Sequence, residues 1–204
     1  MLDPHTDFIV PERNWWDYKY AHKLGHRYAT FRMAFVEVLK SSGPDRACIE
    51  TGCVREANDY GAGYSTMIIA ELISWYGGSL QTVDLNPKHI ALCKKLTEPF
   101  SDFITYHVGD SVAFLKSWSK PIDFLYLDSY DYPQTPKEGP IEPSQRHCLA
   151  ELEAALPQLR SGSIVLIDDA RMPGGGKPGL AKHRLVELGA ECLLDDYQLL
   201  WRMP

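Results

Sequence analysis

The chain has 204 residues, 45% of them hydrophobic and 24% charged, which is typical of a folded globular protein. Lysine and arginine number 21 and aspartate and glutamate 27, so the formal net charge is -6, which disfavours nucleic-acid binding. Five scattered cysteines form no CxxC pair, which argues against a zinc or redox site and favours a reducing cytoplasm. No stretch approaches the roughly 20 apolar residues of a membrane span, and the first residues lack a signal-peptide pattern. We therefore expect a cytoplasmic protein with no membrane partner.

The elements, in chain order, begin with an aromatic-rich segment, Asn14–Lys40, which reads as one or two helices that line a pocket or pack on a sheet. After the turn at 41–44, short apolar runs alternate with amphipathic segments, as in a parallel sheet covered by helices. The predicted strands are Ala47–Glu50, Leu80–Asp84, Ile104–Val108, Ile122–Leu127, Ser163–Ile167, Ala190–Leu194 and Gln198–Trp201. The predicted helices are Thr66–Tyr76, Pro87–Leu96, Ser111–Trp118, Pro143–Leu156 and Leu180–Leu188.

The last two predicted strands are too close in sequence for a crossover helix, so they should pair as an antiparallel hairpin at the end of the sheet. The expected fold class is α/β, with a doubly wound, mostly parallel sheet. We expect a single domain with a helical cap over residues 1–44 and the sheet-containing core over residues 45–204.

Acidic residues lie at or just after the carboxyl ends of five of the predicted strands. They are Glu50, Asp84, Asp110, Asp128, Asp168 and Asp169. Ligands of open parallel sheets bind beyond the carboxyl ends of the strands, so we expect a ligand site at this edge.

A glycine-containing segment, Gly61–Thr66, precedes the first predicted helix of the core. Glycine lets a ligand approach the backbone, and a helix N-terminus favours negative charge, although a plain tight turn explains the same residues. Asp84 could bind the two hydroxyls of a ribose, or it could cap the helix that begins at Pro87. Asp110 and Ser111 carry the same two alternatives, with the Ser111 hydroxyl a candidate helix cap.

Three carboxylates, those of Asp128, Asp168 and Asp169, should crowd together if their strands are neighbours. Like charges at 4 Å repel by about 4 kcal/mol at an effective dielectric of 20, so the cluster needs compensation. A hard divalent cation such as Mg²⁺ would supply it, because carboxylate-only sites suit Mg, Ca or Mn. A raised pKa, or a capping role for Asp169, is the alternative.

Two weaker features remain. Gly174–Lys177 resembles a phosphate loop but lacks the first glycine of that motif, so an active-site flap or a plain connector fits better. His26, His107 and His147 are isolated histidines, which are more often structural or solvated than catalytic.

Six short motifs, taken together, resemble those of class I S-adenosylmethionine-dependent methyltransferases over about three quarters of the chain. They are Ile49–Gly52, Gly61–Thr66, Val83–Pro87, Val108–Ser111, Leu125–Asp128 and Leu166–Asp169. The arrangement of Asp128 with Asp168 and Asp169 is similar to that in the metal-dependent O-methyltransferases of the catechol and macrocin types. The resemblance implies a Rossmann-like fold with S-adenosylmethionine as cofactor, and Mg or another hard divalent cation held by those three aspartates.

The resemblance also implies roles for individual residues. The cofactor-binding residues would be Glu50, Gly52, Gly61, Gly63 and Ser65 near the methionine part, Asp84 at the ribose, and Asp110 with Ser111 at the adenine. The sequence departs from the family at an insertion, Cys53–Tyr60, which divides the glycine motif. Where the catechol type has a lysine, three residues after the first metal aspartate, this chain has Asp131.

The expected reaction is methylation of a hydroxyl on a small molecule, such as a catechol, a sugar or a natural-product intermediate. The metal at Asp128 would bind the hydroxyl, and Asp131, or as a second choice His147, would take its proton. An NAD(P)-dependent oxidoreductase and a non-catalytic nucleotide-binding module are the alternatives. The aromatic N-terminal segment could be a lid or the contact of a homodimer.

Overall fold

The structure, a computed structural model, describes residues 15–61, 64–133, 135 and 137–204. Its sheet contains the strands β1 (Ala47–Thr51), β2 (Ser79–Asp84), β3 (Ile104–Val108), β4 (Ile122–Leu127), β5 (Leu159–Ile167), β6 (Glu191–Asp195) and β7 (Leu199–Arg202). The α-helices are α1 (Trp15–Tyr20), α2 (Tyr28–Ser41), α3 (Ser65–Tyr76), α4 (Pro87–Leu96), α5 (Ser111–Ser117), α6 (Glu142–Ala155) and α7 (Gly179–Glu187). None of the helices in these ranges is long and apolar enough to cross a bilayer.

The strand order is β3-β2-β1-β4-β5-β7-β6, and the first five strands are parallel. The predicted terminal hairpin is confirmed, but the last strand in sequence is not the edge strand. β7 lies between β5 and β6 and is antiparallel to both. The α/β fold class, with a mostly parallel sheet and one antiparallel hairpin, is therefore confirmed.

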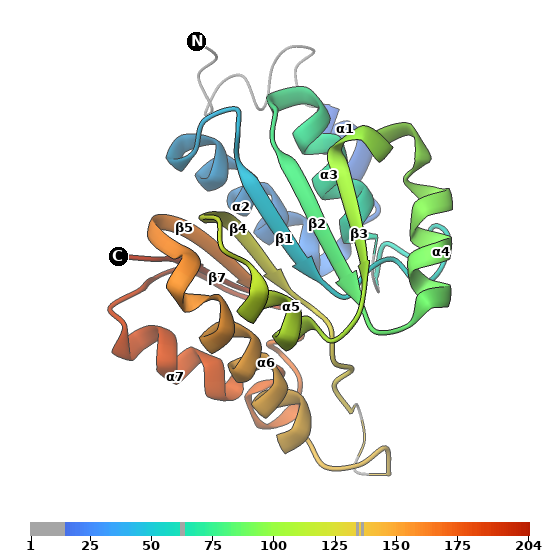
Figure 1. The fold of residues 1–204 in the computed structure, drawn as a ribbon. Coiled ribbons are helices and arrows are strands. Elements are labelled where there is room, and N and C mark those ends of the chain that lie inside the picture. Colours follow the sequence, from blue (N-terminus) through green and yellow to red (C-terminus); the bar gives the residue numbers. More distant parts are fainter. Residues whose placement is uncertain (1–14, 62–63, 134, 136) are drawn as a thin grey trace.

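Helices cover both faces of the sheet, with α1, α2 and α3 on one face and α5, α6 and α7 on the other (Figure 1). Successive strand residues point to opposite faces, so β4 sends Phe124 to the first layer and Leu125 to the second. Burial on both faces explains why the parallel strands read as continuous apolar runs.

The predicted N-terminal helical segment forms two α-helices, α1 and α2, which are joined by a short 3-10 turn. Trp16 and Tyr20 are buried and their rings pack 4.7 Å apart, and the Trp16 ring also lies 5.2 Å from that of Phe35. This aromatic layer packs on the sheet, as one of the two sequence alternatives predicted, while Tyr18 points into solvent.

Candidate active site

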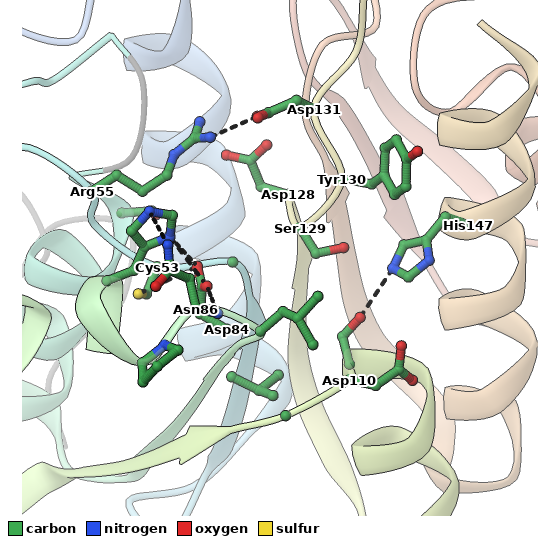
Figure 2. Close-up of a pocket in the computed structure, with 18 residues that line it drawn as sticks. Cys53, Arg55, Asp84, Asn86, Asp110, Asp128, Ser129, Tyr130, Asp131 and His147 are labelled. Atoms are coloured by element: carbon green, nitrogen blue, oxygen red, sulfur yellow. Dashed lines mark hydrogen bonds and ion pairs between the residues drawn. The ribbon is translucent and has the colours of Figure 1, made fainter. Parts of the chain in front are cut away.

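A cavity of about 490 Å³ lies at the carboxyl ends of β1, β2, β3 and β4 (Figure 2). It is lined by Gly52, Cys53, Arg55, Ser65, Val83, Asp84, Leu85, Asn86, Pro87, His89, Gly109, Asp110, Ser111, Asp128, Ser129, Tyr130, Asp131 and His147. The parallel register brings these strand ends to one edge, where Thr51 of β1 faces both Val83 and Leu127. Three of the six acids predicted at this edge, Asp84, Asp110 and Asp128, therefore line the cavity.

Asp84 ends β2 at one side of this cavity. Its Oδ1 accepts a hydrogen bond from the Asn86 backbone N–H at 2.7 Å and lies 3.2 Å from His89 Nδ1. The helix cap that Asp84 could have supplied comes instead from Asn86, whose side chain accepts from the Lys88 N–H. The Asp84 carboxylate is thus oriented by its neighbours and lines the cavity.

Asp110 and His147 lie in the wall formed by α5 and α6 (Figure 2), and Ser111 lines the same cavity. The cap of α5 is Asp110, which accepts from the Ala113 N–H at 2.7 Å, so the prediction that Ser111 caps this helix is wrong. The Ser111 hydroxyl instead lies 3.1 Å from His147 Nε2. A hydrogen bond to Glu151 raises the pKa of His147 above its ordinary value.

Glu50 is fully buried beneath the turn that leaves β1. Its Oε2 accepts from the hydroxyls of Thr66 at 2.6 Å and Thr82 at 2.8 Å, while Oε1 has no partner among the described residues. Burial raises the pKa of Glu50 to about 7, although the hydroxyls of Ser65, Thr66 and Thr82 oppose the rise. Gly52 has φ +82°, and a Cβ there would overlap the carbonyl oxygen of Asp128, so glycine allows β1 and β4 to meet closely.

The remaining residues predicted near the methionine part of the cofactor lie in different places. Ser65, at the start of α3, lines the 490 Å³ cavity, whereas Gly61 lines a neighbouring one. Gly63 lies outside the residues that the structure describes.

The neighbouring cavity measures about 320 Å³ and is lined by Arg27, Arg55, Gly61, Asp128, Asp131, Tyr132, Glu138, Asp169, Met172 and Tyr197. Three of these residues, Arg55, Asp128 and Asp131, also line the larger cavity. The two spaces therefore share a wall. Arg55 comes from the insertion, and its guanidinium lies 2.7 Å from Asp131 Oδ1, so the insertion forms part of this wall (Figure 2).

Asp128, Asp168 and Asp169 come together at the smaller cavity, as predicted, and Asp128 and Asp169 form part of its lining. Lys177 Nζ lies 2.5 Å from Asp128 Oδ1 and 3.3 Å from Asp169 Oδ2, and Arg27 Nε lies 2.8 Å from Asp168 Oδ2. Burial raises the pKa of Asp168, but Arg27 and Lys177 outweigh it and hold that pKa below its usual value. Burial also raises the pKa of Asp128, where Lys177 opposes the effect.

The predicted magnesium site does not fit these donors. Two of the three negative charges of the cluster are offset by a buried ammonium group and a guanidinium of the chain itself. No group of three or more His, Cys, Asp or Glu side chains in the described ranges is arranged to hold a metal ion.

Three residues of the site were missed by sequence reasoning: Arg27, Arg55 and Lys177. Lys177 stands in the glycine-rich segment that the sequence predicts to be a flap or a connector, a prediction that gives the lysine no role. Arg27 lies 141 residues from its partner Asp168, and no local pattern marks such a pair.

The comparison with known proteins agrees with this geometry. The family described as "Methyltransferase domain" matches residues 59–170, more than half of the chain. No curated protein matches the chain in sequence. One similar solved structure is CalS11, a TDP-rhamnose 3'-O-methyltransferase of calicheamicin biosynthesis, with TM-score 0.60, 20% identity and coverage of 95% of this chain and 88% of that one.

Two further solved structures share the fold at lower identity. The methyltransferase PaMTH1 of Podospora anserina, bound to S-adenosylhomocysteine, has TM-score 0.60 and 16% identity and covers 100% of this chain and 89% of that one. An rRNA methylase from Streptococcus thermophilus has TM-score 0.55 and 9% identity, with 85% and 96% covered. With its strand order, its cavity at the carboxyl edge and the family match over residues 59–170, the chain belongs to the class I S-adenosylmethionine-dependent methyltransferases.

Proposed function

We propose that this methyltransferase acts on a hydroxyl group of a small molecule, such as a catechol, a sugar or a natural-product intermediate. The observation that carries the proposal is the pair of adjoining cavities that share Arg55, Asp128 and Asp131. The larger cavity would hold the cofactor, and the smaller one the acceptor. Transfer between them needs the two reactants to meet in line at the shared wall.

The larger cavity suits S-adenosylmethionine. The Asp84 carboxylate, held by Asn86 and His89, would accept hydrogen bonds from the ribose hydroxyls. Asp110 and Ser111 would border the adenine, and the unpartnered Oε1 of Glu50 lies buried close to the residues that would surround the methionine part. When bound, the cofactor supplies a methyl group on a positively charged sulfur.

Asp131 is the candidate general base. It lines both cavities, and Arg55 orients its carboxylate from 2.7 Å. The acceptor hydroxyl would pass its proton to Asp131 while its oxygen forms a bond to the methyl carbon and the carbon–sulfur bond breaks. His147 lines the cofactor cavity but not the acceptor cavity, which makes it the weaker candidate.

The charge of the acceptor cavity favours a small molecule over RNA. Four acids line it, Asp128, Asp131, Glu138 and Asp169, and Asp168 adjoins them, so five acids stand against the three cations that contact them, Arg27, Arg55 and Lys177. A phosphate backbone would be repelled by such a wall. The net charge of -6 acts in the same direction.

The test has two arms. Calorimetric titration with S-adenosylhomocysteine and with NAD should show binding of the first alone. Incubation of the protein with methyl-deuterated S-adenosylmethionine and a panel of catechols, sugar nucleotides and RNA oligonucleotides should label a hydroxyl of a small molecule, as read by mass spectrometry. Failure to bind S-adenosylhomocysteine, or label found on RNA alone, would overturn the proposal.

A further inference from the structure

The three clustered aspartates have no free oxygen to offer a metal. Each of their six carboxylate oxygens faces a donor of the chain. The donors are Lys177 for Asp128 Oδ1 and Asp169 Oδ2, Arg27 for Asp168 Oδ2, the Asp169 backbone N–H for Asp168 Oδ1, and Tyr197 for Asp169 Oδ1. The single hydroxyl hydrogen of Tyr126 is shared between Asp128 Oδ2 and Asp168 Oδ2. A divalent cation binds through lone pairs of carboxylate oxygens, and here every one of these oxygens already has a donor of the chain beside it.

Lys177 occupies the place between two of the carboxylates. It is 1% exposed, although lysine is almost never fully buried unless it is paired. Its ammonium group bridges Asp128 at 2.5 Å and Asp169 at 3.3 Å. A divalent cation bound by the same two aspartates would lie beside this positive charge and be repelled by it.

The loop that carries Lys177 is built to hold it there. The Lys177 backbone N–H donates to the Asp169 carbonyl at 3.3 Å. The Gln145 side chain donates to the carbonyls of Gly174 and Gly176, each at 2.9 Å, and the Tyr132 hydroxyl donates to the Pro173 carbonyl. This segment, predicted to be a flap or a connector, is therefore clamped to the end of β5 and to α6.

Asp169 itself is held in an uncommon conformation. Its φ of +56° lies in the left-handed region, which aspartate tolerates better than most residues. The conformation lets Asp169 line the acceptor cavity while its Oδ1 accepts from the Tyr197 hydroxyl at 2.9 Å. The backbone conformation of Asp169 and the hydrogen bond to its side chain therefore both hold it in place within the cluster.

We infer that Lys177, with Arg27, takes the place of the divalent cation that the family resemblance implies, so that this protein transfers methyl groups without a metal. Lys177 lines neither cavity, so it is a positioning residue that holds Asp128 and Asp169 in the acceptor wall from behind. The role of Lys177 in methyl transfer rests on the proposed function. The replacement of a metal by Lys177 can be tested without an acceptor.

The experiment uses Mn²⁺, whose electron paramagnetic resonance signal reports the free ion. Titration of the wild-type protein should leave the signal unchanged, and the melting temperature should be equal in EDTA and in excess Mg²⁺. The Lys177→Ala variant should lose thermal stability, bind one Mn²⁺ per chain at least tenfold more tightly than the wild type, and regain part of its melting temperature in Mn²⁺. The matched control is Lys182→Ala, which removes an exposed ammonium 2.8 Å from Asp195 and should gain no Mn²⁺ binding.

The wild-type titration decides the question even if Lys177→Ala does not fold. Stoichiometric Mn²⁺ binding to the wild type that is lost in Asp128→Asn would overturn the inference. So would a folded Lys177→Ala variant with unchanged stability and no gain of Mn²⁺ affinity. Binding of S-adenosylhomocysteine in EDTA is measured separately, so that failure of the cofactor site is distinguished from failure of the lysine replacement.

Discussion

At the scale of single residues, Asp131 and His147 compete for the role of general base, and the cavities separate them. Asp131 lies in the shared wall, whereas His147 lines only the cofactor cavity, where its Nε2 lies 3.1 Å from the Ser111 hydroxyl. A base must lie within hydrogen-bond reach of the proton that it takes, directly or through one water. The geometry therefore favours Asp131.

Replacing Asp131 with asparagine should lower kcat by about 10²- to 10⁴-fold, the usual contribution of a positioned base, with little change in the affinity for S-adenosylhomocysteine. His147→Asn should act mainly on cofactor affinity. Glu153→Gln is the control, because it removes a surface carboxylate that pairs with Arg184 outside both cavities. A kcat that falls in His147→Asn but not in Asp131→Asn would reverse the assignment.

Glu50 should make stability depend on pH. Its pKa is about 7 in the folded protein against 4.5 in the unfolded chain, so between these values the folded state keeps a proton that the unfolded chain has lost. The free energy of unfolding should then be highest, as far as Glu50 is concerned, below pH ~4.5 and should fall by up to about 3 kcal/mol as the pH rises through 7.

Urea unfolding of the wild type and of Glu50→Gln at about pH 5 and pH 8 checks this contribution. The variant lacks the ionisable group but can still accept from Thr66 and Thr82, so it should lose less stability at the higher pH. Glu98→Gln, at an exposed position, should behave as the wild type does. Equal pH dependence in all three proteins would show that Glu50 titrates normally.

At the scale of elements, the strands and helices were largely predictable, because burial on both faces produces apolar runs that no exposed segment shows. β5 begins at Leu159, four residues before the predicted start at Ser163, since its polar first half contributes less to the core. The order of β6 and β7 was not predictable. A hairpin pattern shows that two strands pair, but not which of them joins the sheet.

The glycine-rich loop that carries Lys177 allows a matched pair of variants. Gly175 and Gly176 both have positive φ, at +90° and +65°, so alanine is strained at either position. A Cβ at 176 would also overlap the Asp169 carbonyl and meet Ala170, whereas a Cβ at 175 has nothing within 4 Å. The two substitutions therefore differ in steric overlap.

Gly176→Ala should lower the free energy of unfolding by roughly 1–3 kcal/mol more than Gly175→Ala does, the usual cost of overpacking. Denaturant unfolding measures the difference. Gly176→Ala should also gain some Mn²⁺ affinity, because it displaces the loop that positions Lys177. Equal losses of stability would mean that the loop is not held against β5.

At the scale of the whole molecule, the sequence predicted where the site lies but not how its charges are balanced. The six acids at the strand ends do reach one edge, because parallel strands share a direction. Their compensating cations could not be foreseen, since Lys177 is 49 residues from Asp128 and reaches it only through the folded loop. Because the sequence does not show that these cations lie next to the carboxylates, it predicted a metal ion to offset the carboxylate charge.

Cofactor binding should be visible in the stability of the whole chain. A ligand that binds only the folded state at 100 times its Kd stabilises it by about 2.7 kcal/mol. For a chain of about 200 residues this corresponds to a rise in Tm of roughly 5–10 °C. S-adenosylhomocysteine should produce such a rise by thermal denaturation, and NAD should not.

Asp84→Asn isolates the contact on which that rise depends. A hydrogen bond to a charged group contributes about 1.5–3 kcal/mol, so the variant should bind S-adenosylhomocysteine roughly 10- to 100-fold more weakly and show a smaller rise in Tm at the same concentration. Asp102→Asn, at an exposed position outside both cavities, should keep the full rise. If Asp84→Asn retained it too, the ribose would have to be held elsewhere in the cavity, and the acidic edge would serve the acceptor alone.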